Sequence, residues 1–334
     1  MKRRTGLLWT AVVLIGGVAG WLAFLSRTPG PLCEPGEAVA SASAATWAAR
    51  APMPTARSEV GVAALGGRVY VAGGISLTGT RRSFEAYDAA EDAWTRLAPL
   101  PDGRHHAPLA AAAGHVFIAG GYTSLRREMT AQVWAYDPVS DGWARRADLP
   151  APRAAHALVA LDGFVYAMGG VGPRSDAVWR YDPVADLWDE LGAGLPTRRE
   201  HLAAVALDGK IYAIAGRWEG RNLASVEIFD PATGEWTAGA PMPTARSGLA
   251  AAAVAGRIHV IGGEDLEASC VFDRHEVYDP AVNAWTVQGP APVARHGVGA
   301  ASIGDTVYVV GGGIRPGLQT IIAATGRTDA LLPR

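Results

Sequence analysis

The stretch RAAHALVALDGFVYAMGGVGPRSDAVWRYDPVADLW, residues 153 to 188, contains in order an arginine, a double glycine, a Tyr-Asp-Pro element and a tryptophan. The same order recurs along the 334-residue chain. A repeat of this length is typical of propellers and solenoids, in which each unit buries its apolar face against the next unit. The sequence therefore predicts a repeat architecture rather than an ordinary globular core.

Six units align on these features, and each arginine precedes the first residue of its glycine pair by sixteen positions. The arginines are Arg57, Arg104, Arg153, Arg199, Arg246 and Arg295, and the aligned tryptophans are Trp47, Trp94, Trp143, Trp188, Trp236 and Trp285. Most of the length variation lies between the glycines and the Tyr-Asp element. Each unit therefore has one variable loop, and the aligned Tyr and Trp residues are predicted to pack between units.

Four short strand signals occur within residues 153–188. They are the runs 157–161 and 164–168, a third near 178–181 and a fourth around Trp188. The turns between them carry Asp162-Gly163 and Asp182-Pro183, which suit tight connections. Four antiparallel strands in each unit are typical of propeller blades.

With this pattern the chain resembles the kelch-repeat family, whose hallmark is a double glycine followed by spaced Tyr and Trp. The resemblance covers about residues 46 to 325 and implies an all-β, six-bladed β-propeller. Unit four departs from it with Ala215 in place of a glycine, and unit six lacks its Tyr-Asp-Pro and Trp. We expect Thr320 to Ala324 to form the third strand of blade six, and the N-terminal segment around Trp47 to complete that blade and close the ring.

The N-terminus is interpreted separately, as residues 1–26. Lys2-Arg3-Arg4 precede an uncharged apolar run long enough to cross a bilayer, so we predict a single transmembrane helix that acts as a signal anchor. A cleavable signal peptide is the alternative. The anchor implies a cytoplasmic N-terminus and a periplasmic or extracellular propeller.

The remaining domain boundaries follow from composition. Residues 27–45, rich in Pro, Gly, Ala and Ser, are predicted to be a flexible linker in which Cys33 is unpaired. The propeller is predicted over 46–325, followed by a C-terminal tail at 326–334.

The repeat arginines and the variable loops are expected at one end of the blades, around the channel mouth. The recurrence of the arginines favours a structural role, whereas five histidines and two glutamates follow them without being required by the repeat. The predicted ligand-binding residues are Arg57, Arg104, His105, His106, Arg153, His156, Arg199, Glu200, His201, Trp218, Arg246, Arg295 and His296. Structural hydrogen-bonded networks are the competing role for these side chains.

We predict a membrane-tethered binding module for a protein, peptide or glycan. The alternative is a carbohydrate-active enzyme resembling a sialic acid epimerase (mutarotase), with Glu59, His106, Glu200 and His201 as acid/base candidates. The formal charge of −2 gives no basic field for nucleic acid. No cofactor and no metal site is predicted, because the sequence has no phosphate loop or paired-histidine motif. A copper radical oxidase is disfavoured because neither cysteine is expected near a tyrosine in the channel mouth.

Overall fold

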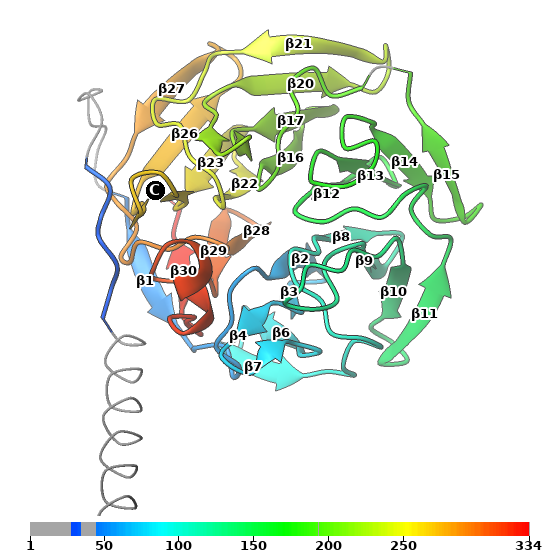
Figure 1. The fold of residues 1–334 in the computed structure, drawn as a ribbon, viewed down its shortest axis with the longest axis horizontal. Coiled ribbons are helices and arrows are strands. Elements are labelled where there is room, and N and C mark those ends of the chain that lie inside the picture. Colours follow the sequence, from blue (N-terminus) through cyan, green and yellow to red (C-terminus); the bar gives the residue numbers. More distant parts are fainter. Residues whose placement is uncertain (1–27, 35–44, 193, 334) are drawn as a thin grey trace, which may run out of the picture.

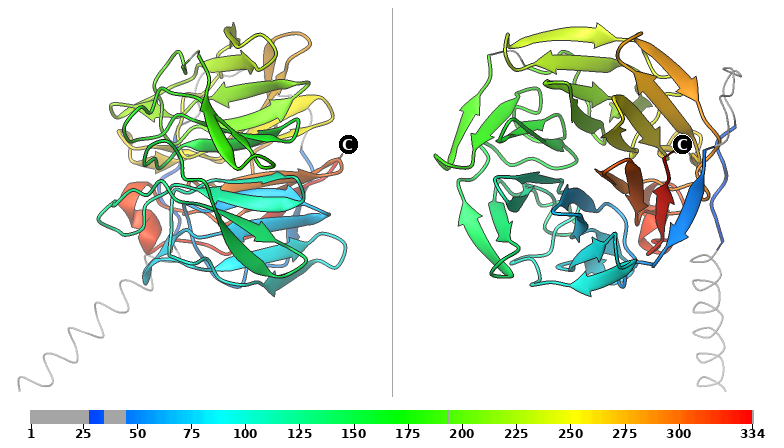
Figure 2. Two further views of the ribbon diagram at one scale, coloured as in Figure 1. Left: turned by 90° about the vertical axis from the view of Figure 1, so that its right-hand side faces the viewer. Right: turned by 180° about the vertical axis from the view of Figure 1, so that it is seen from behind.

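The structure is a computed structural model that describes residues 28–34, 45–192 and 194–333. Six four-stranded antiparallel sheets stand around a central axis as the blades of a propeller (Figure 1). Figure 2 shows the same ring from the side and from behind. The predicted six-bladed, all-β propeller is confirmed.

Each blade runs from an inner strand at the axis to an outer strand at the rim. Blade one consists of β2 (Gly61–Leu65), β3 (Arg68–Ala72), β6 (Phe84–Asp88) and β7 (Ala93–Arg96), and blade two of β8 (Leu109–Ala112), β9 (His115–Ala119), β10 (Val133–Asp137) and β11 (Gly142–Arg146). Blade three consists of β12 (Ala157–Leu161), β13 (Phe164–Met168), β14 (Trp179–Asp182) and β15 (Leu187–Glu190), and blade four of β16 (Ala203–Leu207), β17 (Lys210–Ile214), β20 (Val226–Asp230) and β21 (Glu235–Gly239). Blade five consists of β22 (Ala250–Val254), β23 (Arg257–Ile261), β26 (His275–Asp279) and β27 (Ala284–Val287), and blade six of β28 (Gly299–Ile303), β29 (Thr306–Val310), β30 (Thr328–Leu331) and β1 (Trp47–Arg50).

The variable loops lie between the second and third strands of the blades. Three of them contain a two-stranded hairpin, and the loop of blade six contains a 3-10 helix. These elements are β4 (Ile75–Ser76) with β5 (Gly79–Thr80), β18 (Arg217–Trp218) with β19 (Arg221–Asn222), β24 (Glu264–Asp265) with β25 (Cys270–Val271), and η1 (Gly317–Ile321).

The ring closes in blade six, where β1 pairs with β30 from the other end of the chain. Closure by the segment around Trp47 is therefore confirmed. The expected third strand at Thr320–Ala324 is wrong, because η1 occupies this part of an unusually long loop. The predicted tail at 326–334 is also wrong, because β30 lies within it and pairs with β29 on one side and β1 on the other.

The segment before the propeller is attached to it over residues 28–34. Cys33 forms a disulfide with Cys270, and the Cys33 amide donates to the Val271 carbonyl at 3.0 Å. Leu32 also bridges in parallel to Val271. The predictions of an unpaired Cys33 and of a flexible linker over this part are corrected, because 237 positions separate the two cysteines and hide their pairing in the sequence.

The predicted transmembrane segment at 1–26 lies outside the described residues. Within the described ranges, none of the helices has the length and apolar character needed to span a membrane.

Neighbouring blades are joined by the aligned Tyr and Trp residues. In blade one, the Tyr87 hydroxyl donates to Asp92 at 2.7 Å, Asp92 accepts from the Ala51 amide at 2.9 Å, and the Trp94 indole N–H donates to the Ala51 carbonyl at 2.8 Å. Ala51 directly follows the outer strand of blade six. Tyr136 and Trp143 repeat these bonds one blade later, which confirms the predicted packing role.

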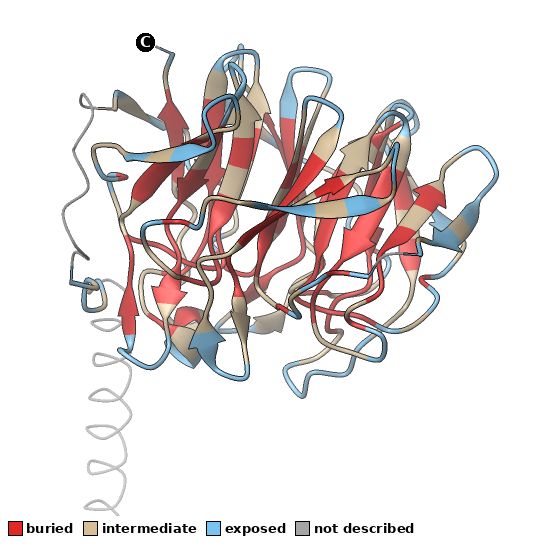
Figure 3. Cartoon of the chain, turned by 90° about the horizontal axis from the view of Figure 1, so that it is seen from above, coloured by how far each residue is buried: buried red, intermediate tan, exposed pale blue. Residues whose placement is uncertain are grey.

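The buried residues fill the spaces between the sheets, and the strands through the middle of the ring are largely buried (Figure 3). Inner strands of adjacent blades touch around the axis, and small residues such as Ala63 and Ala110 allow this approach. The exposed residues lie mainly in the turns and outer strands.

Candidate functional site

The six repeat arginines are structural and do not line the mouth. Arg57, Arg104, Arg153, Arg199 and Arg246 are fully buried, and Arg295 is 2 % exposed. Each guanidinium donates to at least one backbone carbonyl of its own blade. Arg246, for example, binds the Gly262 carbonyl at 2.8 Å and the Glu276 carboxylate at 2.6 Å. The prediction that Arg57, Arg104, Arg153, Arg199, Arg246 and Arg295 bind ligand is therefore wrong.

The residues two positions after these arginines form a closed ring at the channel mouth. Each backbone amide donates to the carbonyl of the equivalent residue in the preceding blade, with N···O distances between 2.7 and 3.2 Å. The members are Glu59, His106, Ala155, His201, Gly248 and Gly297. Blades one, two and four thus place Glu59, His106 and His201 on one circle around the axis.

All six ring residues adopt positive φ, between 52° and 63°. This conformation suits Gly248 and Gly297 but costs a glutamate or histidine of the order of 1 kcal/mol or more. Gly297 also makes room for its neighbour, because a Cβ there would lie 2.5 Å from Glu59 Oε1. Strained residues that the surrounding structure holds in place are common at functional sites.

A second group of side chains supports His201. The Glu200 carboxylate contacts His201 Nδ1 and also accepts from Arg217 Nε at 2.5 Å. Arg217 in turn binds Glu264 Oε1 at 2.8 Å through Nη1. The backbones of Glu200 and Arg217 are paired by an antiparallel bridge. The residue after the repeat arginine Arg199 therefore faces the residue after the Ala215-Gly216 pair.

The charges in this group stabilise one another. Burial alone would raise the pKa of Glu200, but His201 and Arg217 outweigh it and lower that pKa to about 2. Burial likewise opposes ionisation of Glu264, whereas His296, the Gly317 amide and Arg217 hold its pKa below the ordinary value. For Arg217, burial is outweighed by Glu200 and Glu264, and its pKa is raised. Both carboxylates are therefore ionised at neutral pH.

His106 lies on the other side of the ring. Its Nε2 is 3.3 Å from Glu59 Oε2, and its Nδ1 is 2.5 Å from His105 Nδ1. Burial lowers the pKa of His106 well below its usual value, and His201, His105, Arg217 and Arg127 add to this effect. His106 is therefore neutral at pH 7. Its ring also meets the ring of His201 edge to face, with 4.7 Å between centroids.

His296 completes the network beside blade six. Its Nε2 is 2.7 Å from the Arg315 carbonyl oxygen, whereas its Nδ1 is 3.2 Å from Glu264 Oε2 and 3.7 Å from Glu59 Oε1. A continuous set of polar contacts thus runs from Glu59 through His296, Glu264 and Arg217 to His201.

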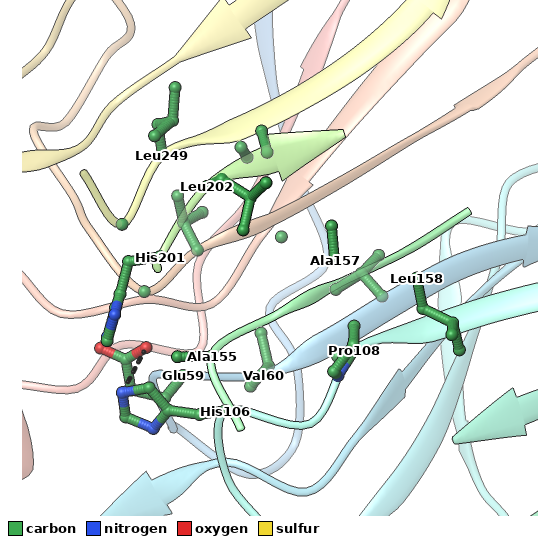
Figure 4. Close-up of a pocket in the computed structure, with 18 of the residues that line it drawn as sticks. Glu59, Val60, His106, Pro108, Ala155, Ala157, Leu158, His201, Leu202 and Leu249 are labelled. Atoms are coloured by element: carbon green, nitrogen blue, oxygen red, sulfur yellow. Dashed lines mark ion pairs between the residues drawn. The ribbon is translucent and has the colours of Figure 1, made fainter. Parts of the chain in front are cut away.

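These groups surround a cavity of about 530 Å³ at the mouth. Tyr122, Trp218, Glu200, Arg217, Glu264 and His296 line it together with Glu59, His106 and His201. Below it, the channel narrows to a space of about 160 Å³ between the inner strands. Figure 4 shows Glu59, His106 and His201 together at one end of that apolar channel, which is walled by residues such as Val60 and Leu202.

Two of the predicted histidines do not line this cavity. His105 is 4 % exposed and acts through its contact with His106. His156 is 5 % exposed and lies in the channel wall, where the closely approaching Gly120 and Gly170 accommodate it. The structure therefore corrects their assignment as direct ligand contacts, and it keeps His106, Glu200, His201, Trp218 and His296 in the site.

The structure also assembles features that sequence reasoning missed. The network role of Arg217 and Glu264 follows from their place directly after the glycine pairs, which is a recognisable signal in the aligned units. The ligand atoms of Glu59, His106 and His201 lie within 4.8 Å of one another, which makes them a possible metal-binding set. No sequence motif indicates this set, because its members come from three different blades.

Comparisons with known proteins agree with this architecture. The family model of the Attractin/LZTR1 β-propeller matches residues 69–314. Among solved structures, the chain is similar to that of YjhT, with a TM-score of 0.72 and 18 % sequence identity over 83 % of this chain and 95 % of that chain. At this identity the likeness shows the fold alone. The search of curated proteins found no match.

Proposed function

Since this chain belongs to the Attractin/LZTR1 β-propeller family, a kelch-type fold that serves binding and catalysis alike, we propose from its site that it is a recognition module. The mouth cavity binds a polar ligand, namely a glycan or the exposed end of a peptide or protein. The observation that carries this proposal is the convergence of carboxylates, imidazoles and one guanidinium in a cavity of about 530 Å³. That size suits a small ligand or one projecting group of a larger partner.

The chemistry of the cavity favours a glycan among these ligands. Glu200 and Glu264 offer acceptors for hydroxyl groups, and Arg217 offers donors that its two ion pairs hold in place. Trp218 and Tyr122 add aromatic faces to the same cavity. This combination of fixed polar groups and aromatic walls is suited to sugar rings.

We expect the full-length chain to bind members of a panel of neutral, amino and acidic sugars, and Arg217→Ala to weaken that binding by about 30-fold or more. The reason is that Glu200 and Glu264 lose their shared countercharge in a buried site. Saturation-transfer NMR and calorimetry measure the effect. Arg257→Ala is the matched control, because Arg257 pairs with Asp279 on the surface and its side chain is 59 % exposed.

Thermal unfolding shows whether each variant is folded, and Trp218→Ala provides a second test because this residue is only partly buried. Unchanged sugar affinity in folded Arg217→Ala and Trp218→Ala proteins would refute the assignment of the mouth as the binding site.

A sugar mutarotase is the second candidate, and one observation favours it. The Glu200–His201 and Glu59–His106 pairs lie side by side, with the two imidazoles in contact. In mutarotation the bond between the anomeric carbon and the ring oxygen breaks. The hydroxyl on the anomeric carbon loses a proton, and the ring oxygen gains one. Adjacent acid and base groups suit this exchange. Faster anomeric exchange by NMR, lost in His201→Ala, would favour the enzyme, and exchange at the buffer rate would exclude it.

We further propose that the propeller lies outside the cytoplasm, tethered by residues 1–26. The Cys33–Cys270 disulfide supports this placement, because such bonds persist in oxidising compartments. A reporter that is active only in the cytoplasm, fused after Arg334, is expected to be inactive. Activity of that fusion would contradict the orientation.

A further inference from the structure

We propose that Glu59, His106 and His201 form a binding site for a divalent transition metal of the zinc type. The site lies on the propeller axis, at the floor of the mouth cavity and the top of the channel. It goes beyond the proposed recognition function and does not depend on it, because metal binding is measured without any sugar or peptide.

The hydrogen bonds fix which nitrogen of His106 is free. The Ser124 carbonyl can only accept, so His105 Nε2 carries the proton in their contact at 3.1 Å. In neutral His105 the Nδ1 atom is then an acceptor, and His106 Nδ1 must donate to it across 2.5 Å. The lone pair of neutral His106 therefore sits on Nε2, which faces Glu59 Oε2 at 3.3 Å. Two hydrogen-bond acceptors therefore face each other, and a cation between them would remove the repulsion between their lone pairs.

His201 offers its second nitrogen in the same way. Its Nδ1 contacts the Glu200 carboxylate, which can only accept, so Nδ1 carries the proton and Nε2 holds the lone pair. Arg217 Nη2 lies 3.2 Å from both ring nitrogens, and a metal at Nε2 would replace its contact with that nitrogen. A carboxylate that orients a histidine through its other nitrogen is typical of metal sites.

Glu59 supplies the anionic ligand. Its side chain is 9 % exposed, and its carboxylate contacts, among the described residues, are the ion-pair distances to His106 Nε2 and to His296 Nδ1 at 3.7 Å. No backbone amide or hydroxyl in the described part of the chain donates to this carboxylate. A carboxylate buried to this extent without a donor is costly unless a cation accompanies it.

The carboxylates around the site also favour a bound cation. The carboxylates of Glu59, Glu200 and Glu264 surround the site, and Arg217 is the buried guanidinium that pairs with two of them. At the exposed rim, Arg127 and Glu219 offset one another. A divalent cation bound to Glu59 would add positive charge among these carboxylates.

The ligand set points to zinc and its neighbours rather than to calcium or magnesium. Two imidazole nitrogens and one carboxylate oxygen are typical of zinc and similar transition metals, whereas calcium and magnesium prefer oxygen ligands. The His106–Glu59 separation of 3.3 Å already suits two ligands of one ion, since each ligand lies about 2.1 Å from zinc. His201 must move inward slightly, and the remaining coordination position opens to the cavity.

The test uses the full-length chain, freed of metal with a chelator and titrated with Co²⁺ and then Zn²⁺. We expect about one bound cobalt per chain, with visible absorption bands that Zn²⁺ abolishes. Glu59→Gln, His106→Ala and His201→Ala are expected to lose stoichiometric binding. His105→Phe removes the acceptor that orients His106, together with the donor to the Ser124 carbonyl, and should weaken binding by about 10- to 100-fold.

His115→Ala is the matched control, since His115 hydrogen-bonds the Ala113 carbonyl in the turn at the opposite end of blade two. It should bind cobalt as the unaltered chain does. The proposal is overturned if the folded chain retains neither metal, if folded Glu59→Gln and His106→Ala proteins bind as tightly as the parent, or if His115→Ala loses binding to the same extent.

Discussion

A chain ending at Gly326 is expected not to form a stable propeller, with a loss of more than about 5 kcal/mol, comparable to the whole stability of many domains. The truncation removes β30, which forms the backbone pairing between β29 and β1 in blade six. It also removes Asp329, which is fully buried and binds Arg295 Nη2 at 2.6 Å. Arg295 would then be buried without a countercharge, and β1 would have no strand to close against.

Thermal and urea unfolding, with circular dichroism as the signal, measure this effect. A chain lacking only Pro333 and Arg334 is the matched control, because it keeps β30 and the Leu332 amide bond to the Thr46 carbonyl. The prediction fails if the chain ending at Gly326 unfolds within about 5 °C of the control, a shift that corresponds to about 1–2.5 kcal/mol in a domain of 150–250 residues.

Arg246→Met is expected to lower the free energy of unfolding by about 3–5 kcal/mol. Arg246 and Glu276 are both fully buried, and their ion pair spans 2.6 Å. Without the guanidinium, the Glu276 carboxylate stays buried without a countercharge. The Gly262 and Thr244 carbonyls also lose their donor. Adding Glu276→Leu to Arg246→Met should recover much of the loss, because the second change removes the unpaired charge.

Urea unfolding of these variants is compared with Arg257→Met, which breaks an exposed pair with Asp279 and should cost less than about 1 kcal/mol. Equal losses in Arg246→Met and Arg257→Met would contradict the structural role of the Arg246–Glu276 pair.

Much of the fold could be predicted because the packing residues repeat. Tyr87 and Trp94 make the same bonds as their counterparts in blades two, three and five, so several blades independently indicate the same packing. The third strand of blade six was misplaced because it lacks the Tyr-Asp element and follows a longer loop. A usable signal was present in Asp329, which pairs with its arginine as Glu85, Glu227 and Glu276 do in other blades.

The candidate site was predictable only in part. His106, Glu200 and His201 stood out because they break the repeat, and the structure places them at the mouth. The arginines and His156 were misassigned because spacing gives the end of the blade at which a residue lies. Spacing does not give the direction in which its side chain points, and Arg153, for example, stacks over Trp179 inside its blade with 3.6 Å between the guanidinium carbon and the ring centroid.

The sequence by itself determined the number of blades, the variable loop in each, and the positions at which the repeat is broken. These properties are local or periodic, so they can be recognised by comparing the units with one another. Only the tertiary structure decided that β30 closes the ring, that Cys33 pairs with Cys270, and that Glu59, His106 and His201 meet on one axis. The physical reason is that closing the ring brings equivalent positions of distant blades into contact, and the backbone hydrogen bonds around the axis then hold their different side chains together.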